Sequence, residues 1–411
     1  MLQNKGCSAE SVMKRADKLA EYSSDKEQLT RAYLTDEHKQ ANEQLANWMS
    51  QASLQTWVDS VGNQWGRKVS ANPTQRTIII GSHSDTVTNA GKYDGNLGIL
   101  LAIEAMEQLA YQSFPFHIDI VAFADEEGVR FDTTLIGSSA VAGCFDKKWL
   151  AIEDDTGLTM EEAMLEFGLD PALAGQDMRH PEEIEAYLEV HIEQGPVLEK
   201  ENRSVGVVTG IAGAKRFMLT ASGVAGHAGT VPIELRHDAL CAVAEMINSI
   251  EVFSKTHSLV ATVGKCEVLD GAVNVIPGSV EFSLDIRCLE QSKLELATAE
   301  ILEKLQAIAH VRGVSLHSEK VYQADAVQCS RRLQRLWASA VEAVTEGPVH
   351  SLPSGAGHDA LAMQHLTDVG MLFVRCEKGI SHNPKEAVSP KDVNVALQCL
   401  IEAVIQYERA V

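Results

Sequence analysis

Two glutamates, Glu126 and Glu127, stand side by side where the apolar run HIDIVAFAD ends. Carboxylates this close resist ionising together unless a positive charge lies between them. Adjacent residues that leave a strand point in different directions, so one carboxylate can bind a cation while its neighbour reaches a water molecule. A free carboxylate beside such a water can act as a general base, which typically raises the reaction rate by about 10²–10⁴-fold. Taken alone, the pair is better explained as a solvated strand end.

Other imidazoles and carboxylates occur in similar contexts. His83 lies in GSHSD, Asp94 in GKYDGNLG, His191 in LEVHIEQG and His382 in GISHNP. A single histidine is more often structural, but together these groups form a ligand set without thiolates, which suits Zn, Mn, Co or Ni. Asp85, two residues after His83, is placed to orient that imidazole through a hydrogen bond.

The surrounding elements would position these groups. The apolar runs TIIIG and DIVAFA, separated by the helical segment NLGILLAIEAMEQLA, predict a strand–helix–strand unit in a largely parallel sheet. Ligands in such sheets bind at the carboxyl ends of the strands. His83 and the Glu126–Glu127 pair both follow predicted strands, so we expect them at the same edge.

The pattern of apolar and polar residues changes near residue 212, within the glycine-rich segment GIAGAK, which we interpret as a hinge. The following residues predict the order β-α-β-β-α-β, typical of a ferredoxin-like domain. A helix over 331–344 and a strand over 369–376 then resume the first pattern. We therefore predict an α/β catalytic domain formed by 1–212 and 330–411, with an α+β domain inserted at 213–329.

Composition excludes several classes of protein. A net charge of −22 argues against nucleic-acid binding, which requires a basic face. The eight cysteines contain no CxxC pair, as expected for thiols in a reducing cytosol. We expect no signal peptide in MLQNKGCSAE, no membrane span, and a cytoplasmic location.

Six ordered motifs resemble those of the M20-type metallo-amidohydrolases, and more narrowly their carbamoyl-amidohydrolase branch. The motifs are GSHSDTV with GKYDG, FADEEGVRF, EVHIEQGPVLE, GHAGTVP, NVIPG with DIR, and SGAGHDA with GISHNP. The resemblance extends from about residue 60 to 400. It implies a zinc-peptidase-like catalytic domain, with the inserted domain acting as a lid and as the contact between the subunits of a homodimer.

The resemblance also implies a site with two divalent metal ions per subunit. Manganese is the metal we expect, with zinc, cobalt and nickel as alternatives. The implied metal ligands are His83, Asp94, Glu127, His191 and His382. Asp94 would bridge the ions, and Glu126 would be the general base.

Further residues are implied to bind a small anionic ureido substrate. Asn274 and Arg287 would hold the substrate carboxylate, with help from Arg216, because an arginine fork suits a carboxylate. His227 would enter the partner subunit's site and stabilise the oxyanion. The remaining contacts would come from Gln194, to the ureido group, and from His358, which would line the pocket.

The family pattern leaves several functions open. We expect hydrolysis of a terminal ureido group, first of allantoate to ureidoglycine, ammonia and carbon dioxide, because MLFVRCEKGISHNP resembles allantoate amidohydrolases and Arg375 could serve a second ureido arm. An N-carbamoyl-L-amino-acid hydrolase or ureidopropionase is the alternative. An M20 metallopeptidase is a more distant one, and a binding protein on a degraded scaffold would lack the intact ligand set.

Overall fold

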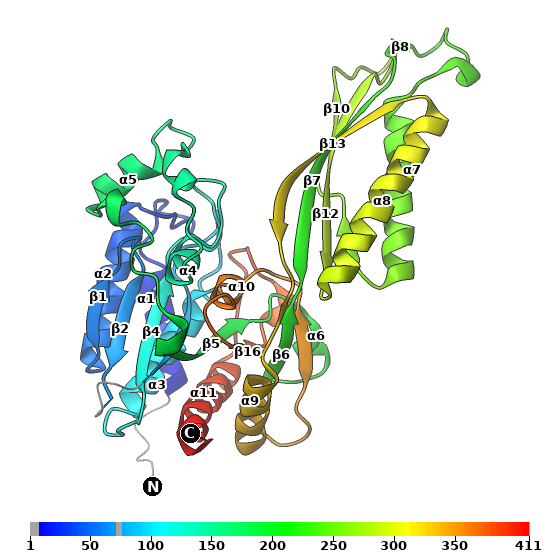
Figure 1. Cartoon of the computed structure of the whole chain (residues 1–411). Helices are drawn as coiled ribbons and strands as arrows, with labels where there is room; N and C mark the ends of the chain where they lie inside the picture. Colours follow the sequence, from blue (N-terminus) through cyan, green and yellow to red (C-terminus); the bar gives the residue numbers. More distant parts are fainter. Residues whose placement is uncertain (1–7, 71–75, 411) are drawn as a thin grey trace. The chain divides into compact units, whose positions relative to one another are not determined.

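The chain divides into two compact units in the computed structural model (Figure 1). The first comprises Met1–Thr209 and Cys329–Val411, and the second comprises Gly210–Gln328, whereas the sequence places the boundaries at 212/213 and 329/330. The structure describes residues 8–70 and 76–410. The segment at the start of the chain, where no signal peptide is expected, lies largely outside the described residues.

Four parallel strands in the order β4-β3-β5-β16 form the centre of the sheet of the first unit. Antiparallel strands flank them, so the sheet is mixed at its edges. The strands of this sheet are β1 (Gln55–Val58), β2 (Gln64–Lys68), β3 (Thr77–His83), β4 (His117–Phe123), β5 (Ile184–Ile192), β6 (Val205–Ile211), β14 (Val327–Gln328), β15 (Ser351–Ser354) and β16 (Val369–Val374).

The register of the parallel strands brings their carboxyl ends to one edge. His83 pairs with Phe123 across β3 and β4, and His191 pairs with Phe373 across β5 and β16. Every residue of β3, β4 and β16 is buried, which explains their continuous apolar runs. Two of the three predicted ligand histidines, His83 and His191, therefore leave the buried sheet at the same edge.

Helices cover the sheet and complete the core of the first unit. α3 is almost entirely buried and packs against β3 and β5, where Gly98 allows close approach because a Cβ there would lie 2.1 Å from the Val190 carbonyl oxygen. The helices are α1 (Ser8–Leu19), α2 (Asp36–Gln51), α3 (Asn96–Gln108), α4 (Ile136–Val141), α5 (Met160–Phe167), α6 (Val197–Lys200), α9 (Arg331–Val344), α10 (Ala360–Met363) and α11 (Pro390–Ala410).

The second unit has a sheet in the order β10-β12-β7-β13 with two helices packed against it. Alternate residues of β12 are buried, so one face of the strand contacts the helices. The elements are β7 (Gly213–Ser222), β8 (Gly226–His227), α7 (Ala239–His257), β9 (Val260–Thr262), β10 (Cys266–Leu269), β11 (Val275–Ile276), β12 (Ser279–Cys288), α8 (Gln291–Arg312) and β13 (Ser315–Ala324). The predicted fold class, an α/β domain interrupted by an α+β domain, is confirmed.

The second strand of the predicted β-α-β-β-α-β order, over LVATVGKCEVL, consists of two strands, β9 and β10, which both pair with β12. The backbone between them turns away, and the Ser283 hydroxyl accepts hydrogen bonds from the N–H groups of Gly264 and Lys265. A side chain thus replaces the missing ladder partners, which apolar periodicity could not reveal.

Among the described residues, no helix combines the length and apolar character needed to cross a bilayer.

Candidate metal centre

Three of the predicted ligands form a buried group at the carboxyl edge of the sheet. His83 ends β3, His191 lies near the end of β5, and Asp94 precedes α3. The His191 Nε2 atom lies 3.3 Å from Asp94 Oδ1 and 3.5 Å from His83 Nε2. Gly95 turns the chain with φ +64°, and a Cβ there would lie 2.5 Å from the His83 ring, so glycine is required at this position.

A second group shares Asp94 with the first. His382 Nε2 lies 3.2 Å from Asp94 Oδ2 and 3.4 Å from Glu127 Oε1. The two Asp94 oxygens therefore face different groups: Oδ1 faces His191, and Oδ2 faces His382. A carboxylate placed in this way is suited to bridge two ions.

The spacing of the donor atoms fits divalent metal ions. Ligands arranged tetrahedrally around an ion with bonds of about 2.0–2.1 Å are separated from one another by about 3.4 Å. The four separations given above lie between 3.2 and 3.5 Å. The donors are imidazole and carboxylate, as expected for Zn, Mn, Co or Ni.

The electrostatics of the site place two of the ligands, Asp94 and His191, in forms that can bind a cation. Burial would raise the pKa of Asp94, but its hydrogen bond with His382 and the charges of His191 and His83 hold that pKa below its ordinary value. Burial lowers the pKa of His191 to about 4, so this imidazole is neutral at pH 7. Burial raises the pKa of Glu127 to about 7. Metal binding would therefore displace a proton from part of the Glu127 population.

Glu126 differs from Glu127 in its surroundings. Burial, followed by the charge of Glu127, raises the pKa of Glu126 well above its ordinary value. Its carboxylate lies within 4.8 Å of donor atoms of His83 and Glu127, but it does not belong to either group of donor atoms that contains Asp94. Glu126 thus lies beside the candidate ligands but is not part of the group formed by Asp94, Glu127 and His382.

Asp85 holds the backbone of the glutamate pair, a role that the sequence did not reveal. Its two carboxylate oxygens accept hydrogen bonds from the N–H groups of Glu126 and Glu127, at 3.0 and 3.1 Å. His83 Nδ1 lies 3.1 Å from the Asp85 carbonyl oxygen and 3.5 Å from its carboxylate. The expected orientation of His83 by Asp85 therefore comes mainly through the backbone carbonyl.

Gln194 and His358 both lie beside the candidate ligands. The Gln194 amide donates from Nε2 to both Asp94 oxygens, each at 3.0 Å. His358 is 1% exposed, packs edge-on against His191 with ring centroids 4.5 Å apart, and pairs through Nε2 with Ser354 at 2.8 Å. His358 thus supports a ligand from within the protein, and its place in the lining of the substrate pocket stays a prediction.

The two predicted substrate arginines lie together in the second unit, on neighbouring strands. Asp285 on β12 pairs with Arg216 on β7 and contacts both guanidinium groups. It accepts two hydrogen bonds from Arg287, at 2.9 and 3.0 Å, and one from Arg216 at 3.0 Å. Arg216 also lies over the Tyr322 ring, 4.6 Å from its centroid. A single carboxylate therefore fixes the orientation of both arginines.

His227 and Asn274 form a separate group in the same unit. β8 pairs with β11 so that His227 is opposite Val275, and the Ala228 N–H donates to the Asn274 carbonyl oxygen. These short strands lie beside the Ser222–Ser279 end of the long β7–β12 ladder in the chain, β8 after β7 and β11 before β12; Figure 1 shows this for β8.

Arg287 is eight residues along β12 from Ser279, roughly 26 Å at about 3.3 Å per residue. Asn274 and Arg287 of one chain are therefore too far apart to hold the same small carboxylate, and the predicted carboxylate clamp would need these residues from two subunits. The family resemblance implied both residues but not the subunit that each comes from, because only the register reveals at which end of a strand each residue lies.

Arg375 also has a role different from the expected one. Its guanidinium binds the Asp392 carboxylate through two hydrogen bonds, at 3.0 and 2.9 Å, and contacts Asn202 at 3.3 Å. The Asp392 side chain is 2% exposed and lies in the first turn of α11. Arg375 therefore anchors this helix, and its service to a second ureido arm stays a prediction.

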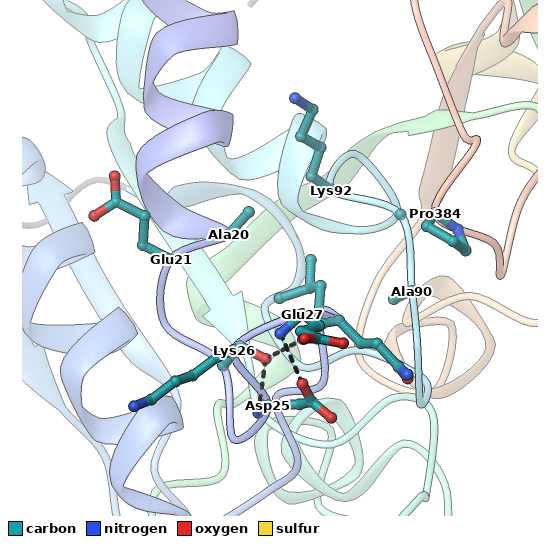
Figure 2. A pocket seen from close by; sticks show the side chains of 12 residues that line it. Ala20, Glu21, Asp25, Lys26, Glu27, Ala90, Lys92 and Pro384 are labelled. Carbon is teal, nitrogen blue, oxygen red and sulfur yellow. Dashed lines mark hydrogen bonds between the residues drawn. The ribbon is translucent and has the colours of Figure 1, made fainter.

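Sequence reasoning missed Ser381 and Glu386, which contact the metal-ligand loops. Glu386 is 4% exposed although it lies in a polar loop segment, KEAVSP, that gives no periodic signal of burial. Ala90 and Pro384, from the two loops concerned, also line a surface pocket of about 540 Å³ (Figure 2). The rest of that pocket comes mainly from residues 20–29, including Asp25, Lys26 and Glu27.

Comparison with known proteins agrees with this fold. Residues 79–406 match the family described as Peptidase family M20/M25/M40. The chain is 39% identical to an N-carbamoyl-L-amino-acid amidohydrolase of Pseudomonas sp. (strain NS671), covering 92% of each chain. It is 38% identical to the allantoate deiminase of Arabidopsis thaliana, covering 94% of this chain and 80% of that one.

A solved structure supports the same relationship. The amidase of the hydantoinase/carbamoylase family from Burkholderia multivorans superposes with a TM-score of 0.89 at 28% identity, covering 97% of both chains. The chain therefore belongs to peptidase family M20/M25/M40, as an amidohydrolase of the carbamoyl-amidohydrolase branch that its motifs predict.

Proposed function

We propose that this enzyme hydrolyses the terminal ureido C–N bond of a small carboxylate, with allantoate as the first substrate to test. The observation that carries the proposal is the pair of donor groups sharing Asp94, with Glu126 beside them. Relatives named allantoate deiminase and N-carbamoyl-L-amino-acid amidohydrolase support the bond type.

In the proposed site, His83, His191 and Asp94 hold one divalent ion, and Asp94, Glu127 and His382 hold a second. Bound ions supply Lewis-acid polarisation of the substrate carbonyl and lower the pKa of a coordinated water. Manganese is the metal we propose for the enzyme, with zinc, cobalt or nickel as alternatives, because the donor set suits all four.

The proton transfers belong to Glu126. Its carboxylate takes a proton as the water oxygen attacks the ureido carbon, and returns the proton to the nitrogen that leaves as ammonia. The remaining carbamate then breaks down to an amine and carbon dioxide. The raised pKa of Glu126, caused by burial and by Glu127, favours holding the proton between these two steps.

Residues of the inserted domain would bind the substrate. Arg287, oriented by Asp285, is proposed to clamp the substrate carboxylate, and Arg216 is proposed to assist. His227 and Asn274 are too far along the sheet to share that small ligand with the arginines of their own chain. We therefore propose a homodimer in which His227 and Asn274 act on the site of the partner, where His227 stabilises the oxyanion.

A second candidate substrate is an N-carbamoyl-L-amino acid. It is favoured by the pairing of Arg375 with Asp392, because this pairing removes one argument for recognition of a second ureido arm. A hydrophobic or small side chain would then take the place of that arm in the substrate.

A substrate panel tests the proposal directly. Chelator-treated protein reloaded with Mn²⁺ is assayed for ammonia release from allantoate, N-carbamoyl-L-amino acids, 3-ureidopropionate and ureidoglycolate, with a dipeptide as the peptidase control. The highest kcat/KM is expected for allantoate. Preference for the N-carbamoyl amino acids would support the second candidate, and cleavage of the dipeptide alone would refute ureido hydrolysis.

A further inference from the structure

We propose that Glu386 is a positioning residue that joins the two loops of the metal centre and sets the orientation of the bridging Asp94. The inference rests on the metal site of the proposed function, but not on the identity of the substrate. Glu386 touches neither the proposed substrate residues nor the donor atoms of the imidazoles in any interaction described above. Its contacts are instead with the backbone and hydroxyl groups that hold the ligands.

One carboxylate oxygen of Glu386 fixes the loop that carries Asp94. Glu386 Oε1 accepts hydrogen bonds from the N–H groups of Tyr93 and Asp94, at 2.8 and 3.1 Å. The two segments are 292 residues apart in the sequence. Two backbone N–H groups in succession are bound to one side-chain oxygen, so this contact restrains the backbone of the bridging ligand.

The other oxygen fixes the loop that carries His382. The Ser381 hydroxyl lies 3.0 Å from Glu386 Oε2 and 3.0 Å from Asp94 Oδ2. The hydroxyl has one proton, so it can donate to only one of these carboxylates at a time. Ser381 thus links the carboxylate of Glu386 to the Asp94 oxygen that faces His382. Restraint of Asp94 and of His382 passes through the same side chain.

The backbone at Gly91 is shaped to admit Glu386. A Cβ at Gly91 would lie 2.3–2.4 Å from the Glu386 Cδ, Cβ and Oε1 atoms, closer than atoms of this kind can approach. The residue at position 91 must therefore lack a side chain for Glu386 to reach Tyr93 and Asp94. Ala90 and Pro384, from the same two loops, are seen around the pocket in Figure 2.

A partner of this kind has a measurable effect on metal affinity. Groups that orient metal ligands typically change affinity by about 10–100-fold when they are removed. The ion held by Asp94, Glu127 and His382 should be affected most, because both loops of that group depend on Glu386. The ion held with His83 and His191 should be affected less, since those ligands are fixed by the sheet.

The test measures binding of Mn²⁺ to chelator-stripped, full-length protein by isothermal titration calorimetry. Glu386→Ala should weaken the second binding event by about 10–100-fold and the first by less. Glu386→Gln should recover part of the affinity, because its amide oxygen still accepts the two N–H groups. Gly91→Ala should weaken the same event, because its Cβ would clash with the Cδ, Cβ and Oε1 atoms of Glu386.

Asp392→Asn is the matched control, since Asp392 is an equally buried acid of the same segment that binds Arg375 and Ser389. Thermal unfolding of the metal-free proteins should show losses of stability for both Asp392→Asn and Glu386→Ala, but only the second should lose Mn²⁺ affinity. Wild-type affinity for both ions in folded Glu386→Ala would overturn the proposal, whatever substrate the enzyme uses. A matching loss of affinity in Asp392→Asn would also overturn it, because general destabilisation would then explain the effect.

Discussion

Replacing Glu126 by glutamine tests the division of labour between the two adjacent glutamates. The amide keeps the size of the side chain, and the backbone N–H groups of Glu126 and Glu127 remain bound to Asp85. The variant cannot accept a proton from water, so kcat should fall by about 10²–10⁴-fold, or about 2.7–5.5 kcal/mol in activation free energy. Because Glu126 does not belong to either group of donor atoms that contains Asp94, two ions should still bind.

The matched variant is Glu127→Gln, which removes a charge from the second donor group. It should bind the second ion more weakly, and part of its activity should return as the concentration of Mn²⁺ rises. Both variants are measured by metal content after dialysis and by ammonia release over a range of metal concentrations. The reasoning is refuted if Glu126→Gln loses an ion while Glu127→Gln keeps both, or if Glu126→Gln turns over at the wild-type rate.

Three further predictions concern the inserted domain and α11. Mixing the inactive variants His227→Ala and Glu126→Gln under conditions of subunit exchange should restore about a quarter of the wild-type sites, because half of the dimers are mixed and each mixed dimer contains one complete site. Donation between subunits would be contradicted if activity did not recover although native mass spectrometry confirmed the exchange. Asp285→Asn should raise KM by about 10-fold, or about 1.4 kcal/mol, with little change in kcat, because Arg287 loses its charged partner; steady-state kinetics showing an unchanged KM would argue against this positioning role. Arg375→Ala should lower the free energy of unfolding by about 2 kcal/mol in denaturant titrations, while the ratio of kcat/KM for allantoate and N-carbamoyl amino acids stays constant; a change in that ratio would return Arg375 to substrate recognition.

The sequence by itself determined the main part of the metal centre. Continuous apolar runs identify buried parallel strands, and the carboxyl ends of such strands meet at one edge. His83 and the Glu126–Glu127 pair follow two of these runs, whereas His191 lies near the end of a strand that glutamates interrupt. Their convergence is therefore a consequence of local pattern and simple topology, and the order of the motifs supplied Asp94 and the family.

Only the tertiary structure decided how these ligands are held and which distant residues can act together. Strand register places Asn274 and Arg287 at opposite ends of one sheet, although they are close in sequence. Arg375 finds Asp392, and Glu386 finds Tyr93 and Asp94, through loops whose polar residues carry no periodicity. Hydrogen bonds of this kind depend on where two segments meet in space, and residue types alone do not encode that meeting.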